Sequence, residues 1–195
     1  MLNRILDKLF PRVCLCCKSI SADRICNNCR PVKKEPAEFQ TGCYYLYPYQ
    51  GNLKEILHEY KFKAQKKIVS QYLKDQLKTD FFINYDLVIP VPSHWLRFFQ
   101  RGFNHLHYLY NFLPNICYGL VRRKKYTCYF YKLKRQEREV IIKGAFQVLR
   151  PDLIKGKKVL IVDDIYTTGT TFNELKQELL KYNPLSVDGF FICRA

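Results

Sequence analysis

The order of hydrophobic and polar positions changes repeatedly between strand-like and helix-like spacing from Cys43 onward. Short apolar runs predict strands at 43–49, 86–91, 116–121, 157–162 and 185–193. Amphipathic spacing predicts helices at 52–62, 66–78, 103–112 and 170–182. Because strands that alternate with helices need crossover connections, the sequence predicts an α/β fold with a parallel sheet flanked by helices.

The first forty residues follow a different pattern. Apolar side chains share one helical face over 1–10, and Pro11 ends that face. Five of the nine cysteines lie between residues 13 and 30, and the stretch 31–40 holds two prolines among mixed charges, as linkers do. We therefore expect an N-terminal helix, cysteine module and linker over 1–40, followed by the α/β domain over 41–195.

The chain carries a formal net charge of +16, from 33 Lys and Arg against 17 Asp and Glu. Basic residues gather at 61–67, 122–125 and 132–135, and Tyr126, Tyr129 and Tyr131 lie beside them. Two interpretations stay open: solvated faces, or a surface for single-stranded DNA on which tyrosines stack. On the second, the candidate contacts are Arg122, Arg123, Lys124 and Lys125.

Two CxxC pairs, separated by eight residues, form the cysteine module. Cys14, Cys17, Cys26 and Cys29 have the spacing that closes a tetrahedron around a structural Zn²⁺, and Cys16 is left as a spare thiol. An iron–sulfur cluster is the alternative. The sequence shows neither a secretory signal nor an apolar run of about 18 residues, so we expect a cytoplasmic protein with reduced thiols and no membrane span.

The segment from Val159 to Thr171 carries the most specific chemistry. An apolar strand leads into Asp163 and Asp164, and a loop of threonines and one glycine then opens a helix. Loop amides and a helix N-terminus favour an anion, while two carboxylates would repel a bare phosphate. The combination suits a sugar phosphate whose hydroxyls donate to the carboxylates. The competing interpretation is a helix-capping turn without a ligand.

This segment resembles the motif by which type I phosphoribosyltransferases bind 5-phosphoribosyl 1-pyrophosphate (PRPP). The resemblance implies that Asp163 and Asp164 hold the ribose hydroxyls and are the catalytic candidates. It implies that the 5-phosphate is cradled by Thr167, Thr168, Gly169, Thr170 and Thr171. A second strand exit, at Pro90-Val91-Pro92-Ser93, offers a pyrophosphate site. Val91, Ser93, Arg97 and Arg101 are its candidates, together with Mg²⁺.

Further strings resemble the competence-associated ComF family. They are Pro-Val-Pro followed by Arg101-Gly-Phe-Asn104, then Thr127, Phe130 and Leu133, then Arg138 and Gly144-Ala-Phe146. The resemblance covers Cys14 to Arg194 and implies a cysteine module ahead of a phosphoribosyltransferase domain. The chain departs from the family pattern at His105, Phe130 and Ile141, which leaves the acceptor open.

Two functions follow from the resemblance. The first is a PRPP-binding protein that acts in DNA uptake, handles single-stranded DNA and works with other uptake proteins. The second is an active Mg²⁺-dependent phosphoribosyltransferase that joins a nitrogenous base or amine to ribose 5-phosphate and releases pyrophosphate. His94 and His105 flank the second strand exit. Contact of either one with a ligand is one interpretation, and a surface histidine of that loop is the one we expect.

Overall fold

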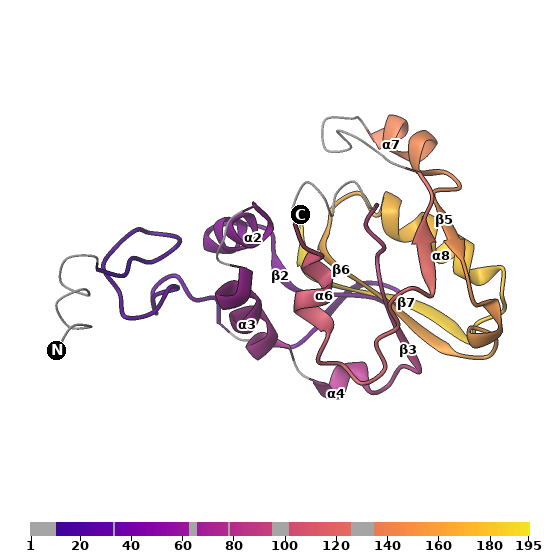
Figure 1. The fold of residues 1–195 in the computed structure, drawn as a ribbon, viewed down its shortest axis with the longest axis horizontal. Coiled ribbons are helices and arrows are strands. Elements are labelled where there is room, and N and C mark those ends of the chain that lie inside the picture. Colours follow the sequence, from indigo (N-terminus) through magenta and orange to yellow (C-terminus); the bar gives the residue numbers. More distant parts are fainter. Residues whose placement is uncertain (1–10, 33, 63–65, 78, 95–101, 126–134) are drawn as a thin grey trace.

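The computed structural model describes residues 11–32, 34–62, 66–77, 79–94, 102–125 and 135–195. Figure 1 shows one sheet with helices against it and the cysteine module at one end. The elements, in order, are β1 Ala37–Gln40, β2 Cys43–Pro48, α2 Asn52–Phe62, α3 Lys66–Gln76, α4 Thr79–Phe82, β3 Leu87–Pro90, α6 His105–Tyr110, β4 Val121–Arg123, α7 Arg135–Ile142, β5 Phe146–Val148, the 3₁₀ turn η2 Pro151–Leu153, β6 Lys158–Tyr166, α8 Thr170–Leu180 and β7 Ser186–Arg194.

The main sheet has the strand order β1-β2-β7-β6-β3. Strands β2, β7, β6 and β3 run parallel, and only the edge strand β1 pairs antiparallel, with β2. Four consecutive residues of β6, from Val159 to Val162, have no exposed surface. A strand that is apolar at every position must be covered on both faces, which is the condition of a parallel sheet between helices.

Aromatic side chains identify the two covered faces. On β7, Phe190 packs against Phe82 of α4 and Tyr110 of α6. Its neighbour Phe191 packs against Phe172 of α8 and Tyr166 of β6. Because successive strand residues point to opposite faces, α4 and α6 cover one face of the sheet and α8 covers the other. β4 and β5 form a separate antiparallel pair, and β5 lies against α8.

The expected fold class is confirmed, and most predicted elements lie within a few residues of the observed ones. Strand β6 is longer than predicted, because Ile165 and Tyr166 still pair with Cys193 and Arg194 of β7. The carboxylates of residues 163 and 164 therefore lie inside a strand rather than after it. The strand predicted at 116–121 is instead β4 at Val121–Arg123. Gly119, with φ +80°, turns the chain before β4, and Ile116 makes only one isolated bridge.

The linker expected at 31–40 ends in regular structure. Its last four residues form β1, whose Ala37 and Glu38 pair with Tyr45 and Tyr44 of β2. These residues belong to the sheet, although the sequence assigned them to the N-terminal part. The helix expected at 1–10 lies outside the described residues. Among those described, no helix is both long enough and apolar enough to cross a bilayer.

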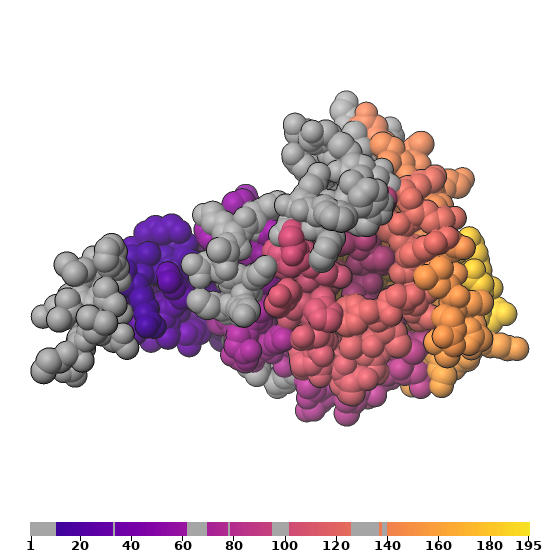
Figure 2. Space-filling view, viewed as in Figure 1, coloured from indigo at the N-terminus to yellow at the C-terminus, as the bar shows by residue number. Residues whose placement is uncertain are grey.

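The cysteine module lies beside α3 at one end of the molecule, as the space-filling view shows (Figure 2). The guanidinium of Arg30 lies 5.9 Å from the centre of the Tyr72 ring on α3, and the Tyr72 hydroxyl donates to the carbonyl of Pro31. The module also contacts α2, since the Lys18 ammonium lies 3.9 Å from the carboxylate of buried Glu59. The module is therefore fixed against both helices.

Candidate functional site

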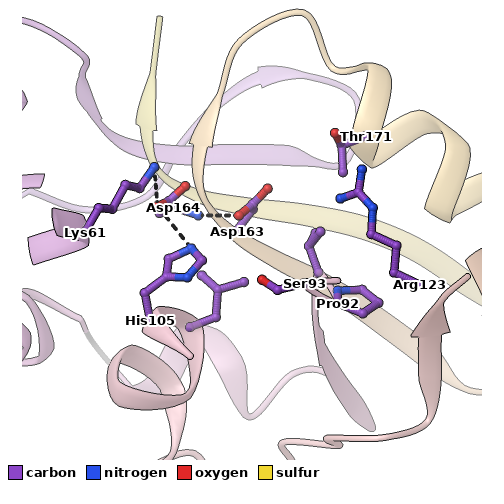
Figure 3. Close-up of a pocket in the computed structure, with 10 residues that line it drawn as sticks. Lys61, Pro92, Ser93, His105, Arg123, Asp163, Asp164 and Thr171 are labelled. Carbon is purple, nitrogen blue, oxygen red and sulfur yellow. Dashed lines mark hydrogen bonds and ion pairs between the residues drawn. The ribbon is translucent and has the colours of Figure 1, made fainter. Parts of the chain in front are cut away.

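Asp163 and Asp164 lie near the carboxyl end of β6, with Asp164 on the side of Lys61 and His105 and Asp163 on the side of Thr171 and Arg123 (Figure 3). Asp164 is only 5% exposed, and its amide donates to Oδ1 of Asp163 at 2.9 Å. The hydroxyl of Tyr110 donates to the carbonyl of Asp163 at 3.1 Å, which ties α6 to the strand at this point. The two carboxylates are thus held by the backbone of a central strand rather than by a loop.

Two cationic or proton-bearing side chains surround Asp164. The Lys61 ammonium, from the end of α2, lies 2.6 Å from Oδ2 of Asp164, and the Lys61 side chain is 17% exposed. Nε2 of His105, the first residue of α6, lies 3.4 Å from the same oxygen. In Figure 3 Lys61 and His105 approach Asp164 from the side that faces away from Asp163. Asp164 is therefore an ion-paired carboxylate.

The positions of Lys61 and His105 follow from how their helices are anchored. Asn104 caps α6, because its side-chain oxygen accepts from the amides of Leu106 and His107. The hydroxyl of buried Tyr60, the residue before Lys61, donates to the carbonyl of His105. This bond joins the end of α2 to the beginning of α6, so both side chains are directed toward the same carboxylate.

The two aspartates differ in their electrostatic surroundings. Burial by itself raises the pKa of Asp164, but the nearby Lys61 ammonium and then His105 outweigh it, so this pKa lies well below the usual range. Burial, and then the negative charge of Asp164, raise the pKa of Asp163 to about 7. Asp164 is thus ionised at neutral pH, while Asp163 is the member of the pair that holds a proton readily.

A pocket opens beside Asp163 and is lined by residues from six parts of the chain. Val91 and Ser93 come from the exit of β3, Arg123 from β4 and Thr171 from α8, and Lys61, Pro92, His105, Leu106, Asp163 and Asp164 complete the lining. The Arg123 guanidinium lies 5.5 Å from the centre of the Phe146 ring and points toward Thr171 and Asp163 (Figure 3). Carboxylates on one wall and a guanidinium on the other suit a ligand that carries both hydroxyl donors and an anion.

The loop after β6 lines an adjoining hollow, which shares Asp163 and Thr171 with the first pocket. Gly169, at φ +73°, begins α8, and a Cβ there would overlap the hydroxyl of Tyr166. Only glycine satisfies both the backbone angle and this close approach. Thr168 and Thr170 share a hydrogen bond of 2.8 Å between their hydroxyls. The loop therefore presents threonine hydroxyls and a glycine backbone next to the acidic pair.

The structure brings most of the predicted site residues together. Asp163, Asp164, Thr171, Val91 and Ser93 line the pocket. Thr167, Thr168, Gly169 and Thr170 line the adjoining hollow. Arg97 and Arg101 lie outside the described residues, and so do the tyrosines that were considered for stacking. The roles assigned to all of these residues stay predictions.

Sequence reasoning did not assign Lys61, His105 or Arg123 to the pocket. Lys61 was counted only in a basic run. However, Leu53, Leu57 and Tyr60 form the buried face of α2, and Lys61 lies on the border of that face, four positions after Leu57. The expectation of surface histidines was wrong, since His94 and His105 are 7% and 6% exposed. Arg123 was grouped with the basic residues around it. Strand alternation, with Arg122 exposed and Arg123 partly buried, was the signal that could have separated them.

The four paired cysteines meet in space. The sulfur atoms of Cys14, Cys17, Cys26 and Cys29 all lie within 4.8 Å of one another. The amide of Cys26 donates to the sulfur of Cys14, and Lys18, at φ +62°, forms the turn that follows the first pair. The sulfur of Cys16 is directed instead toward the carbonyl of Asn52 on α2. Four converging sulfur ligands in tight turns can hold a metal ion, and thiolates suit zinc or iron.

Comparison with known proteins gives three kinds of match. The family model described as "Phosphoribosyl transferase domain" matches residues 55–194. The competence protein ComFC of Streptococcus pneumoniae is 27% identical over 96% of this chain and 85% of its own, and that of Bacillus subtilis is 24% identical over 97% and 81%. A solved allosteric regulatory enzyme of purine biosynthesis aligns at 18% identity with a TM-score of 0.40, over 68% of this chain and only 29% of the enzyme's.

The raised pKa of Asp163 predicts a pH-dependent stability difference. The folded protein holds this proton up to about pH 7, whereas an unfolded Asp releases it near pH 4, so wild type loses stability as the pH rises between these values. Relative to wild type, Asp163→Asn should gain roughly 2 kcal/mol of unfolding free energy between pH 5 and pH 7, at about 1.4 kcal/mol per unit. Urea unfolding in Mg²⁺-free buffer measures this difference. Asp152→Asn, at a side chain that is 62% exposed, is the control and should show no such trend.

Proposed function

Because this chain is a ComFC-like member of the phosphoribosyl transferase domain family, we propose that it binds PRPP beside Asp163 and acts in DNA uptake during natural transformation. One observation carries the ligand part. A carboxylate pair and a threonine–glycine loop line two adjoining hollows at the carboxyl end of a parallel strand. This edge of an open α/β sheet is where such folds bind their ligands.

The two hollows divide the ligand between them. Asp163 accepts the ribose hydroxyls, and the amides and hydroxyls from Thr167 to Thr171 hold the 5-phosphate. The pyrophosphate lies toward Val91, Ser93 and Arg123, on the opposite side of the pocket from Lys61. Arg97, Arg101 and Mg²⁺ serve the same group, because a magnesium ion bound by pyrophosphate oxygens neutralises their charge.

The DNA part rests on the relatives and on the charge. Both ComFC relatives are named competence proteins, and this chain carries a net charge of +16. Arg122, Lys124 and Lys125 lie exposed together after Leu120, and Lys125 also donates to the carbonyl of Lys143. We propose that these three residues contact the phosphates of single-stranded DNA in the cytoplasm, and that other DNA-uptake proteins deliver the strand.

A second candidate function is phosphoribosyl transfer itself. The observation that favours it is the contrast within the acidic pair, where Asp164 is ion-paired and Asp163 titrates near neutral pH beside the pocket. A group of that kind can take the proton that a nitrogen acceptor loses when it bonds to C1 of the ribose and pyrophosphate departs. Pyrophosphate release from Mg²⁺-PRPP in the presence of purine bases, pyrimidine bases and amines decides between binding and turnover.

The first prediction of this proposal concerns PRPP binding. At a hundredfold excess over its Kd, Mg²⁺-PRPP should stabilise the wild type by about 2.7 kcal/mol, seen as an upward shift of Tm. Asp163→Asn combined with Asp164→Asn keeps the shape of the pair and removes its charge, so the shift should vanish. Asp152→Asn combined with Asp188→Asn is the control, because neither residue lines the two hollows. Equal shifts in all three proteins would place the PRPP site elsewhere.

The second prediction concerns the metal of the cysteine module. We propose that Cys14, Cys17, Cys26 and Cys29 hold one structural Zn²⁺, and mass spectrometry of purified protein should give about one zinc per chain. Cys29→Ser should lose the zinc and lower Tm, because metal binding contributes directly to folding. Cys43→Ser replaces a buried cysteine outside the group and should keep the zinc. Iron accompanied by visible absorbance would contradict the assignment.

The third prediction concerns single-stranded DNA. A triple substitution of Arg122, Lys124 and Lys125 by Ala should weaken binding of a labelled oligonucleotide in fluorescence anisotropy. It should also flatten the log–log salt dependence by about 2, at about 0.7 per lost phosphate contact. The matched control replaces the exposed Lys54, Lys155 and Lys157. Arg123→Ala should leave DNA binding unchanged and weaken the PRPP shift. If both triple variants behave alike, the effect is one of net charge and the assigned surface is wrong.

A further inference from the structure

The acidic pair has the composition of a divalent-cation site. One ligand atom each from His105, Asp163 and Asp164 lies within 4.8 Å of the others. Carboxylate oxygens and an imidazole nitrogen at this separation are ligands that Mg²⁺ and Mn²⁺ accept. Two of these residues are almost fully buried, so an ion placed among them would be held without much competing water. These three side chains by themselves would therefore favour a divalent cation and not the hydroxyls of a sugar.

Lys61 changes the charge of that set. Its ammonium lies 2.6 Å from Oδ2 of Asp164, and the helix that carries it is anchored at Tyr60. We propose that Lys61 is a specificity-determining residue of the PRPP site. Its ammonium takes the place of a divalent cation at Asp164, so the pair accepts neutral hydroxyls and excludes a free metal ion. This proposal rests on the proposed function and deepens it.

The electrostatic reason is direct. A divalent ion among His105, Asp163 and Asp164 would lie beside a fixed ammonium, and the repulsion is strong in a partly buried site because little water screens it. Lys61 and His105 already engage Oδ2 of Asp164, so the ion would also compete with them for this carboxylate. A ribose hydroxyl is neutral, so it meets no such repulsion. Lys61 thus makes binding of the ion less favourable and leaves binding of the sugar unaffected.

The same arrangement gives the two aspartates different tasks. Asp164 holds Lys61 and His105, whereas Asp163 points toward the side of the pocket where Arg123 and Thr171 lie (Figure 3). Asp163 is therefore the carboxylate that meets the ribose. A magnesium ion that arrives with PRPP would stay with the pyrophosphate, because the Lys61 ammonium at Asp164 would keep it from the acidic pair.

Titration with Mn²⁺ alone tests the proposal without PRPP. Free Mn²⁺ is followed by its electron paramagnetic resonance signal as zinc-replete protein is added. Wild type should bind Mn²⁺ only weakly. Lys61→Met should bind about one Mn²⁺ per chain, with a Kd lower than that of wild type by a factor of about ten or more. Lys61→Arg, which keeps the positive charge, should behave as wild type. Lys54→Met, on the exposed face of the same helix, is the charge-matched control and should also behave as wild type.

A second substitution locates the ion. Adding Asp163→Asn to Lys61→Met should abolish the gained Mn²⁺ binding, because it removes a ligand of the set. If Lys61→Met does not fold, Lys61→Gln supplies the same neutral side chain with a polar end, and circular dichroism and zinc content establish its fold. Tight Mn²⁺ binding by wild type, no gain in the folded neutral variant, or a gain that survives Asp163→Asn would each overturn the proposal. A wild type without a PRPP shift would instead contradict the proposed function and leave the Mn²⁺ comparison intact.

Discussion

The pairing of β6 with a parallel strand on each side is the constraint on which the site depends. Val159 to Val162 pair with β3 on one edge, and residues up to Tyr166 pair with β7 on the other. Because all four apolar residues are fully buried, a shift of register would bring polar residues into the core. The register of β6 therefore fixes the position of its last residues at the edge of the sheet. The acidic pair, the loop and the start of α8 are placed by these residues.

Charge is organised around that fixed point by elements distant in sequence. Lys61 comes from α2, His105 from α6 and Arg123 from β4, so three separate segments place a basic or proton-bearing group next to two carboxylates. Lys61 and His105 contact Asp164, and Arg123 lies across the pocket from Asp164 (Figure 3). The cysteine module contributes indirectly, since Cys16 and Lys18 contact α2 at Asn52 and Glu59. A metal bound by the module would therefore also stabilise the helix that carries Lys61.

The sequence was most informative where one short segment contains both its structure and its chemistry. The strand, acidic pair, loop and helix between residues 157 and 182 were predicted together, because apolar run, carboxylates and threonine–glycine loop are contiguous. The spacing of the four cysteines likewise predicted that they converge. Lys61 was not singled out, and His105 was expected at the surface, because the role of both depends on Asp164, which lies far along the chain. The basic run at 122–125 was treated as one surface, although strand alternation turns Arg123 inward. Charge patterns reveal the composition of a surface, and only the tertiary fold shows which of its residues face a ligand.

The position of β7 determines when the sheet can assemble during translation. β7 lies between β2 and β6, although β2 begins at Cys43 and β7 only at Ser186. Until the ribosome has released β7, β2 has no inner neighbour and the far edge of β6 is unpaired. Both are apolar edges of the kind that recruit other chains. β2 therefore waits through most of the synthesis for its inner neighbour, and a chaperone that covers such edges would serve the nascent protein until the central strand arrives.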